Sequence, residues 1–203
     1  MKVDLHVHSD KSPDGIHPVK DIVKEAKRKG IDGVAITDHD YFHSNREKFK
    51  DIVVLYGAEI TTSLGHAIVL GVRSVSTRNA YELAELIRDE GGAIIPTHLF
   101  SLHKPGMGEK GIEIGTCVEK FNGTDPINNV ISSIKIKNGT GGSDAHHACG
   151  IGLAYTEFPD FGGEDEILLM LEKGKFTARL SLNPAALPLY YIKRYGRKFP
   201  LRV

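Results

Sequence analysis

Histidine and carboxylate side chains gather at four separate points of the chain, each beside an apolar, strand-like run. The four segments are Asp4-Leu5-His6-Val7-His8, Thr37-Asp38-His39-Asp40, Gly57-Ala58-Glu59 and Gly142-Ser143-Asp144-Ala145-His146. Imidazole nitrogens and carboxylate oxygens without thiolates suit zinc, manganese or iron. Barrel-type α/β folds collect such groups where their strands end. The sequence therefore predicts a metal centre built from segments that are far apart along the chain.

His6 and His8 are two residues apart on a predicted strand, so both imidazoles leave the same face and can reach one ion. Two histidines on a solvated strand face would give the same pattern, so the pair alone does not decide between these explanations. Asp4 lies on the same face, where it could orient a ligand through a hydrogen bond.

The next two segments repeat this arrangement at successive strand ends. Asp38 and His39 follow one apolar run, and Glu59 follows the next. Each residue alone is better explained as a loop polar group or a helix cap, but the recurrence favours a shared site. The two oxygens of Glu59 could bridge two cations, and Asp144 could do the same.

Asp144 and His146 again show a spacing of two, in a glycine-rich setting that lets the backbone approach a site closely. A phosphate cradle is the competing explanation, although no Gly-Lys-Ser/Thr ending is present. Ser143 lacks the pattern of a nucleophile elbow, which argues against a Ser-His-Asp hydrolase. The remaining histidines, at positions 17, 43, 103 and 147, are expected to have solvent or core roles.

Apolar periodicity predicts alternating strands and helices. Strands are expected over 2–7, 33–37, 52–56, 66–72, 93–97, 116–121 and 152–158, and helices over 17–28, 79–90, 126–135 and 164–173. This alternation favours a mostly parallel sheet, open or closed into a barrel. Residues 100–112 are expected to form a mobile loop. His66 begins a strand whereas His98 follows one, so a regular barrel brings them together only through an unusual turn.

Composition limits the class of protein. A length of 203 residues predicts one domain, and 26 basic against 26 acidic side chains leave no overall field that would attract nucleic acid or membrane. The apolar runs are too short to cross a bilayer, and no signal-peptide pattern is seen, so we expect a cytoplasmic protein without a membrane partner. The two cysteines are isolated, which disfavours a disulfide framework. The absence of glutamine predicts a thermophilic source.

Taken together and in order, these motifs resemble the PHP (polymerase and histidinol phosphatase) family of metal-dependent phosphoesterases. The matching segments are 4–9, 12–15, 37–39, 57–59, His98 and 142–146. The resemblance implies a distorted seven-stranded, TIM-like β/α barrel with two or three divalent ions, zinc, manganese or iron, at the C-terminal strand ends. By motif position it assigns His6 and His8 to a first ion with Glu59 and Asp144 shared or adjacent, His66 and His98 with Glu59 to a second, and Asp14, His39 and His146 to a third.

The resemblance also implies hydrolysis of a phosphoester by a water molecule activated between two cations. The expected substrate is a small phosphorylated metabolite or a nucleotide, cleaved by a phosphatase or phosphodiesterase. Asp144 and His146 are candidate catalytic groups, and His146 is a candidate proton donor to the leaving group. His103, Lys104 and Lys110 could grip a phosphate, although surface solvation is the better explanation for them.

Two other functions remain open from the sequence. In residues 190–199, tyrosines and a phenylalanine alternate with basic side chains, as stacking on a nucleic acid would require, so a nuclease or nucleic-acid processing subunit is an alternative. Packing of these tyrosines on the barrel would explain the segment more simply. A non-catalytic barrel subunit of a larger assembly is the third hypothesis, against which the intact ligand set argues. The oligomeric state is left open.

Overall fold

The computed structural model describes residues 1–160, 162–181, 183 and 185–195, and the fold below refers to these residues. They form ten strands and six α-helices. The strands are β1 (Lys2–Val7), β2 (Gly33–Ile36), β3 (Val53–Tyr56), β4 (Ala58–Thr61), β5 (His66–Leu70), β6 (Ala93–Pro96), β7 (Glu119–Asn122), β8 (Thr140–Gly142), β9 (Ala154–Glu157) and β10 (Thr177–Leu180). The helices are α1 (Val19–Arg28), α2 (Ala80–Asp89), α3 (Glu109–Ile114), α4 (Pro126–Lys135), α5 (Glu164–Glu172) and α6 (Ala186–Tyr195).

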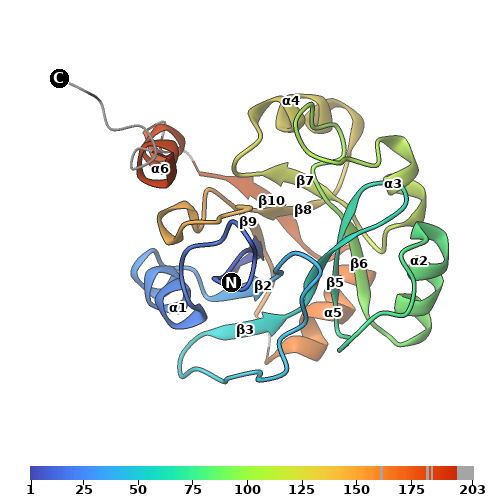
Figure 1. The fold of residues 1–203 in the computed structure, drawn as a ribbon, viewed down its shortest axis with the longest axis horizontal. Helices are drawn as coiled ribbons and strands as arrows, with labels where there is room; N and C mark the ends of the chain where they lie inside the picture. Colours follow the sequence, from blue (N-terminus) through green and yellow to red (C-terminus); the bar gives the residue numbers. More distant parts are fainter. Residues whose placement is uncertain (161, 182, 184, 196–203) are drawn as a thin grey trace.

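The described strands belong to three sheets. The first has the order β10-β9-β1-β2-β3, the second β4-β5-β6 and the third β7-β8. Strands β1, β2 and β3 are parallel, as are β7 and β8, but β9 is antiparallel to both of its neighbours. Figure 1 shows the strands grouped centrally with the helices around them. The expected α/β class is confirmed, whereas the hydrogen-bonded sheets do not close into one ring and a seven-stranded barrel is not confirmed.

The second sheet departs from the expected parallel arrangement. Strand β5 is antiparallel to both β4 and β6, and β4 was not predicted because only Gly57 separates it from β3. A Cβ atom at Gly57 would lie 2.2 Å from the carbonyl oxygen of Val69, so glycine allows the chain to pass between the sheets here. A turn closed by the hydrogen bond from Thr62 N to Gly65 O then reverses the chain into β5. The start of β5 therefore lies near the end of β6.

Buried apolar side chains hold these strands against the helices. Leu83 and Ile87 of α2 pack with Ile94 of β6, and Ile22 of α1 packs with Val34 of β2. The Asn79 side chain begins α2 by accepting hydrogen bonds from the backbone N–H groups of the first turn. Firm packing of these elements fixes the strand ends that carry the polar residues.

Four predicted helices are confirmed, with small shifts at their ends, and the elements that were missed gave weak periodic signals. Helix α3 begins at Glu109 inside the segment expected to be a loop, because six residues are too few to show a helical period. Strand β8 has the sequence Thr-Gly-Gly, whose strand geometry comes from pairing with β7. Strand β10 and helix α6 were also not predicted. None of the helices in the described part of the chain has the length and apolarity to cross a bilayer.

Candidate metal centre

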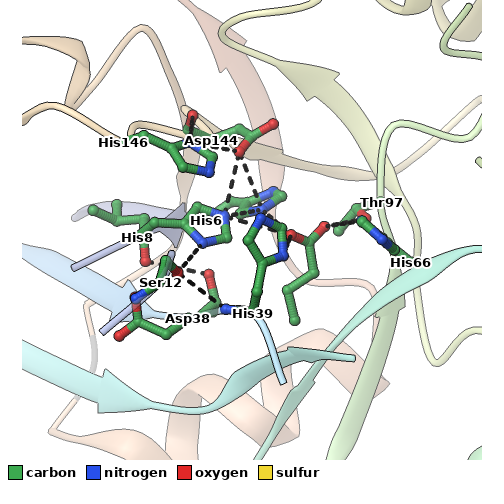
Figure 2. Close-up of polar contacts among 12 residues, drawn as sticks. His6, His8, Ser12, Asp38, His39, His66, Thr97, Asp144 and His146 are labelled. Atoms are coloured by element: carbon green, nitrogen blue, oxygen red, sulfur yellow. Dashed lines mark hydrogen bonds and ion pairs between the residues drawn. The ribbon is translucent and has the colours of Figure 1, made fainter. Parts of the chain in front are cut away.

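The structure brings the predicted metal ligands together where several strands meet. They come from β1, from β4 and the start of β5, and from the segments after β1, β2, β6 and β8. Figure 2 shows histidine rings and carboxylates from these elements pointing toward one another. The antiparallel course of β5 resolves the difficulty of His66 and His98, because its first residue lies beside the residues that follow β6. Both rings lie beside Glu59 Oε1.

The first group of donors surrounds His6 and His8, whose Nε2 atoms lie 3.0 Å apart. Glu59 Oε2 lies 3.3 Å and 3.4 Å from these two nitrogens. Asp144 Oδ1 approaches the same nitrogens at 3.5 Å and 3.3 Å. Two imidazole nitrogens and two carboxylate oxygens from three distant segments therefore converge on one point.

The outer nitrogens of these rings show that the convergence suits a cation. Glu119 Oε1 lies 2.9 Å from His6 Nδ1 and accepts a hydrogen bond from its N–H group. Ser12 Oγ donates its hydrogen to Asp38, so it acts as the acceptor of the hydrogen bond from His8 Nδ1, which lies 2.9 Å away. In neutral rings with these tautomers, both Nε2 atoms turn lone pairs toward the carboxylate oxygens. Two imidazole nitrogens and two carboxylate oxygens that face one point are the ligand set that a divalent ion requires, so the residues fit a metal.

Glu59 faces a second group of donors with its other oxygen. Glu59 Oε1 lies 3.1 Å from His98 Nε2 and 3.5 Å from His66 Nδ1, and it accepts a 2.8 Å hydrogen bond from Thr97 Oγ1. Its Oε2 atom also lies 3.2 Å from His39 Nδ1. The carboxylate thus stands between separate sets of histidines, as the predicted bridge between two cations would.

A third group lies at the edge of the centre. Asp14 Oδ1 is 3.1 Å from His146 Nε2 and 3.9 Å from His39 Nε2. The donor atoms that lie mutually within 4.8 Å form the sets His6-His8-Asp144, His39-Glu59-His66 and His8-His39-His146. The first set agrees with the assignment from motif position. In the second set His39 takes the place that motif position gives to His98, and in the third set His8 takes the place of Asp14. His39 therefore belongs to two of the three sets.

Electrostatics keeps the carboxylates ionised. Although burial opposes ionisation, Lys104 and His6 hold the pKa of Asp144 well below its usual value, and His6 does the same for Glu59. Burial lowers the pKa of His8 to about 3. Glu59, Asp144 and Glu119 outweigh burial and raise the pKa of His6 well above its ordinary value. The three carboxylates attract positive charge, which can be a proton on His6 or a cation in the site. Metal binding would therefore release the proton from His6.

Glu119, which we did not single out from the sequence, is a buried anchor of the centre. In addition to His6, it accepts a 2.8 Å hydrogen bond from the backbone N–H of His98 and a 3.0 Å bond from Asn122 Nδ2. The signal available in the sequence was a single carboxylate within a predicted buried strand. Its place beneath both His6 and His98 follows only from the pairing of β7 with β8.

Asp38 holds the loop that follows β1. It accepts hydrogen bonds from Ser9 N and Ser9 Oγ at 2.6 Å each, and from Ser12 Oγ at 2.8 Å. His43 Nε2 is a further partner at 2.6 Å. Although burial opposes it, the hydrogen bonds from His43, Ser9 and Ser12 lower the pKa of Asp38 to about 2. An ionised Asp38 thus fixes Ser12, which in turn orients the ring of His8.

Asp4 has a different partner from the one expected. It accepts 2.8 Å hydrogen bonds from the backbone N–H groups of Ser143 and Gly152 instead of contacting a histidine ring. Asp4 therefore positions the segment that carries Asp144. Asp144 itself has a φ of 53°, in the left-handed region where ordinary side chains are strained.

A cavity of about 250 Å³ opens onto these ligands. Surface solvation is wrong for Lys104, which lines the cavity, forms an ion pair with Asp144 and lies 2.7 Å from Thr124 Oγ1. His103 also lines the cavity, whereas Lys110 is exposed on α3. Another part of the cavity wall comes from α6, whose last six residues are the first part of the aromatic and basic segment 190–199. Tyr190 is buried against the fold, as the simpler explanation held, whereas Tyr191 and Tyr195 are 40% and 38% exposed. Residues 196–199 lie outside the described residues.

Comparison with known proteins identifies the family. The PHP domain model matches residues 4–143. The chain belongs to the PHP family. A model described as PHP-associated matches residues 131–176, which include Asp144 and His146. The PHP chain is also 32% identical to the uncharacterized protein MJ1587 of Methanocaldococcus jannaschii over 140 residues, 60% of this chain and 82% of the relative.

Two solved structures share the fold of this PHP protein. PsfC from Pseudomonas syringae has a TM-score of 0.73 and 17% identity, with 97% of this chain and 98% of PsfC covered. A protein from Bifidobacterium adolescentis, provisionally named a metal-dependent phosphoesterase, has a TM-score of 0.59 and 16% identity, with 83% of this chain and 95% of that protein covered. At these identities the similarity concerns the fold.

Proposed function

We propose that this PHP protein is a metal-dependent hydrolase that cleaves phosphoesters of a small metabolite or nucleotide. The observation that carries the proposal is the convergence of His6 Nε2 and His8 Nε2 with Glu59 Oε2 and Asp144 Oδ1, each oxygen lying within 3.5 Å of both nitrogens. Two or three divalent ions, zinc, manganese or iron, would be held by the three donor groups. When bound, such ions lower the pKa of water and neutralise phosphoryl oxygens.

The side chains of the chain then have separate tasks. Glu119 and Ser12 hold His6 and His8 in the tautomers that direct their lone pairs inward. Lys104 neutralises Asp144 and would donate to a phosphoryl oxygen that enters the cavity. His146 borders the same cavity, and when its ring does not hold an ion it is the candidate for protonating the leaving oxygen.

The cavity favours small substrates. Its volume of about 250 Å³ lies below the usual range of roughly 300–1,000 Å³ for ligand pockets, and α6 stands on one side of it. A phosphomonoester or a short nucleotide fits such a space better than a duplex does.

The test combines metal analysis with hydrolysis. Protein purified without chelator is analysed for metal and assayed with p-nitrophenyl phosphate and its bis ester in the presence of Mn²⁺, Zn²⁺, Fe²⁺ or Mg²⁺. We expect bound transition metal and turnover that Asp144→Asn abolishes, whereas the exposed Asp165→Asn control stays active. Turnover that persists in metal-stripped protein contradicts the proposal. Protein without metal and without turnover would favour the non-catalytic subunit.

A nuclease is the second candidate, favoured by the aromatic wall of the cavity. Tyr191 and Tyr195 both line it, and their rings are 6.0 Å apart at an angle of 18°. Exposed aromatic faces beside basic groups can stack on bases of a single strand. Salt-sensitive binding of oligodeoxythymidylate, lost in Tyr195→Ala, would support this function, and equal binding by the variant would exclude it.

A further inference from the structure

Helix α6 reaches the outer edge of the metal centre, although Figure 1 places it at the periphery, outside the sheets. Arg194 Nη2 lies 2.8 Å from Asp14 Oδ2, and the Arg194 side chain is only 11% exposed. The two residues are 180 positions apart in the sequence. Asp14 lies in the irregular segment between β1 and α1, so no regular element fixes its carboxylate.

The Asp14 carboxylate is divided between two sides. Its Oδ2 atom binds Arg194, while its Oδ1 atom faces His146 Nε2 at 3.1 Å and His39 Nε2 at 3.9 Å. The guanidinium thus donates to the carboxylate oxygen that points away from the histidines. It leaves the inner oxygen free to act as a ligand together with them.

Tyr190 connects the same helix to His146. Its hydroxyl accepts a 2.7 Å hydrogen bond from Arg194 Nη1 and a 3.3 Å bond from the backbone N–H of His146. The Tyr190 ring is 1% exposed and lies against Gly150, where a Cβ atom would come within 2.7 Å of the ring. This close approach seats α6 firmly on the segment that carries His146.

We infer that α6 completes the outermost ion site, with Arg194 and Tyr190 as the residues that position Asp14 and His146. The inference rests on the metal centre of the proposed function. Arg194 and an ion repel each other, so the arginine weakens binding through charge while it strengthens binding through orientation. Orientation prevails because the guanidinium holds the outer oxygen of an otherwise loosely placed carboxylate. Hydrogen bonds to metal ligands are typically worth 10–100-fold in affinity.

Metal binding tests this role without reference to activity. Mn²⁺ titrations by calorimetry, with elemental analysis of the retained metal, compare the wild-type protein with Arg194→Gln and Tyr190→Phe. Lys193→Gln is the matched control, because Lys193 is an exposed basic residue of the same helix. Thermal melting of each metal-free variant reports whether the fold is intact.

We expect the wild-type protein to bind three ions. The weakest of these should bind roughly 10–100-fold less tightly in Arg194→Gln and Tyr190→Phe, while the two tighter ions and the Lys193→Gln control do not change. Equal or tighter binding of the third ion in Arg194→Gln would overturn the inference, as would a uniform loss at all sites with a lower melting temperature. A wild-type protein that binds only two ions overturns it and leaves the hydrolase in place. Absence of any bound metal overturns both.

Discussion

Glu59 joins the two inner parts of the metal centre. It is almost completely buried, and its two oxygens face different histidines, with His6 and His8 on one side and His98 on the other. A neutral amide at this position would keep the shape of the side chain. It would lose the negative charge and one of the two acceptor oxygens, so it could not bridge two cations.

Replacement of Glu59 by glutamine should therefore disable the centre. A bound metal pair contributes several kcal/mol to the stabilisation of a phosphoryl transition state, which corresponds to a loss of roughly a thousandfold in kcat/KM. Steady-state hydrolysis of p-nitrophenyl phosphate and metal content per chain measure the effect. Glu113→Gln, an exposed change on α3, is the control. Unchanged kcat/KM with a full metal content would show that Glu59 does not bridge.

Asp4 is the buried carboxyl whose ionisation opposes folding. Burial raises its pKa from 3.8 to about 6 against the effect of its backbone hydrogen bonds. The folded state therefore holds a proton that the unfolded state has released between these two pH values. The stability that this protonation contributes is fully present below pH 3.8 and is lost as the pH rises through 6.

We expect the free energy of unfolding of metal-free wild-type protein to fall, relative to Asp4→Asn, by about 2 kcal/mol between pH 4 and pH 6, out of about 3 kcal/mol over the whole titration at about 1.4 kcal/mol for each pKa unit. Urea unfolding in the presence of a chelator measures both proteins across this range. Referring the result to the variant cancels the opposite contributions of groups such as Asp38, whose stabilisation is lost toward acid pH. A difference that stays constant with pH would show that Asp4 titrates normally.

Strand β8 and the strand β1 beside it depend on close approach of their backbones. A Cβ atom at Gly142 would lie 2.4 Å from the Cβ atom of His6 and 3.0 Å from its backbone nitrogen. Both contacts involve rigid parts of the strand that carries His6. The glycine therefore allows β8 to deliver Asp144 to the rings of His6 and His8.

Gly142→Ala should separate β8 from β1. We expect a loss of roughly 1–3 kcal/mol in the free energy of unfolding, as for other overpacked interiors, together with weaker metal binding. Urea unfolding and Mn²⁺ titration measure the two effects. Gly163→Ala is the control, because nothing lies within 4 Å of its Cβ position. Equal stability and affinity in both variants would mean that the backbone adjusts without cost.

The described residues form, we infer, one domain. Strand β9, within the PHP-associated match, pairs with β1 of the PHP match, and β10 pairs with β9. The metal centre is likewise assembled from both matches, because Asp144 meets His6 and His8. A bound ion would therefore tie together segments from most of the chain, and its loss should be felt throughout the fold.

Metal removal should lower the stability of the entire protein. An ion present at 100 times its dissociation constant stabilises the folded state by about 2.7 kcal/mol, so chelator should lower the melting temperature and Mn²⁺ should restore it. Differential scanning calorimetry of chelated, reloaded and untreated protein measures the change. In Asp144→Asn the shift on reloading should be smaller. A melting temperature that is independent of metal would argue against a filled centre.

The types of the ligands and most of the elements could be predicted from the sequence because both depend on local order. A spacing of two places His6 and His8 on one strand face, and apolar periodicity revealed α1, α2, α4 and α5. Glu59 and Asp144 could be recognised in the sequence because a carboxylate beside an apolar run is expected to be buried, and buried carboxylates rarely lack a partner. Cytoplasmic location and a thermophilic source remain predictions.

Contacts between distant segments were decided only by the tertiary structure. His66 meets His98 because β5 runs antiparallel to its neighbours, and the turn that reverses the chain has no apolar period. Glu119 meets His6 across 113 residues, and Arg194 meets Asp14 across 180. The local sequence gives the polarity of a side chain and the periodicity of its neighbours. Its contact partner in the folded chain depends on the path of every strand and turn between the two residues.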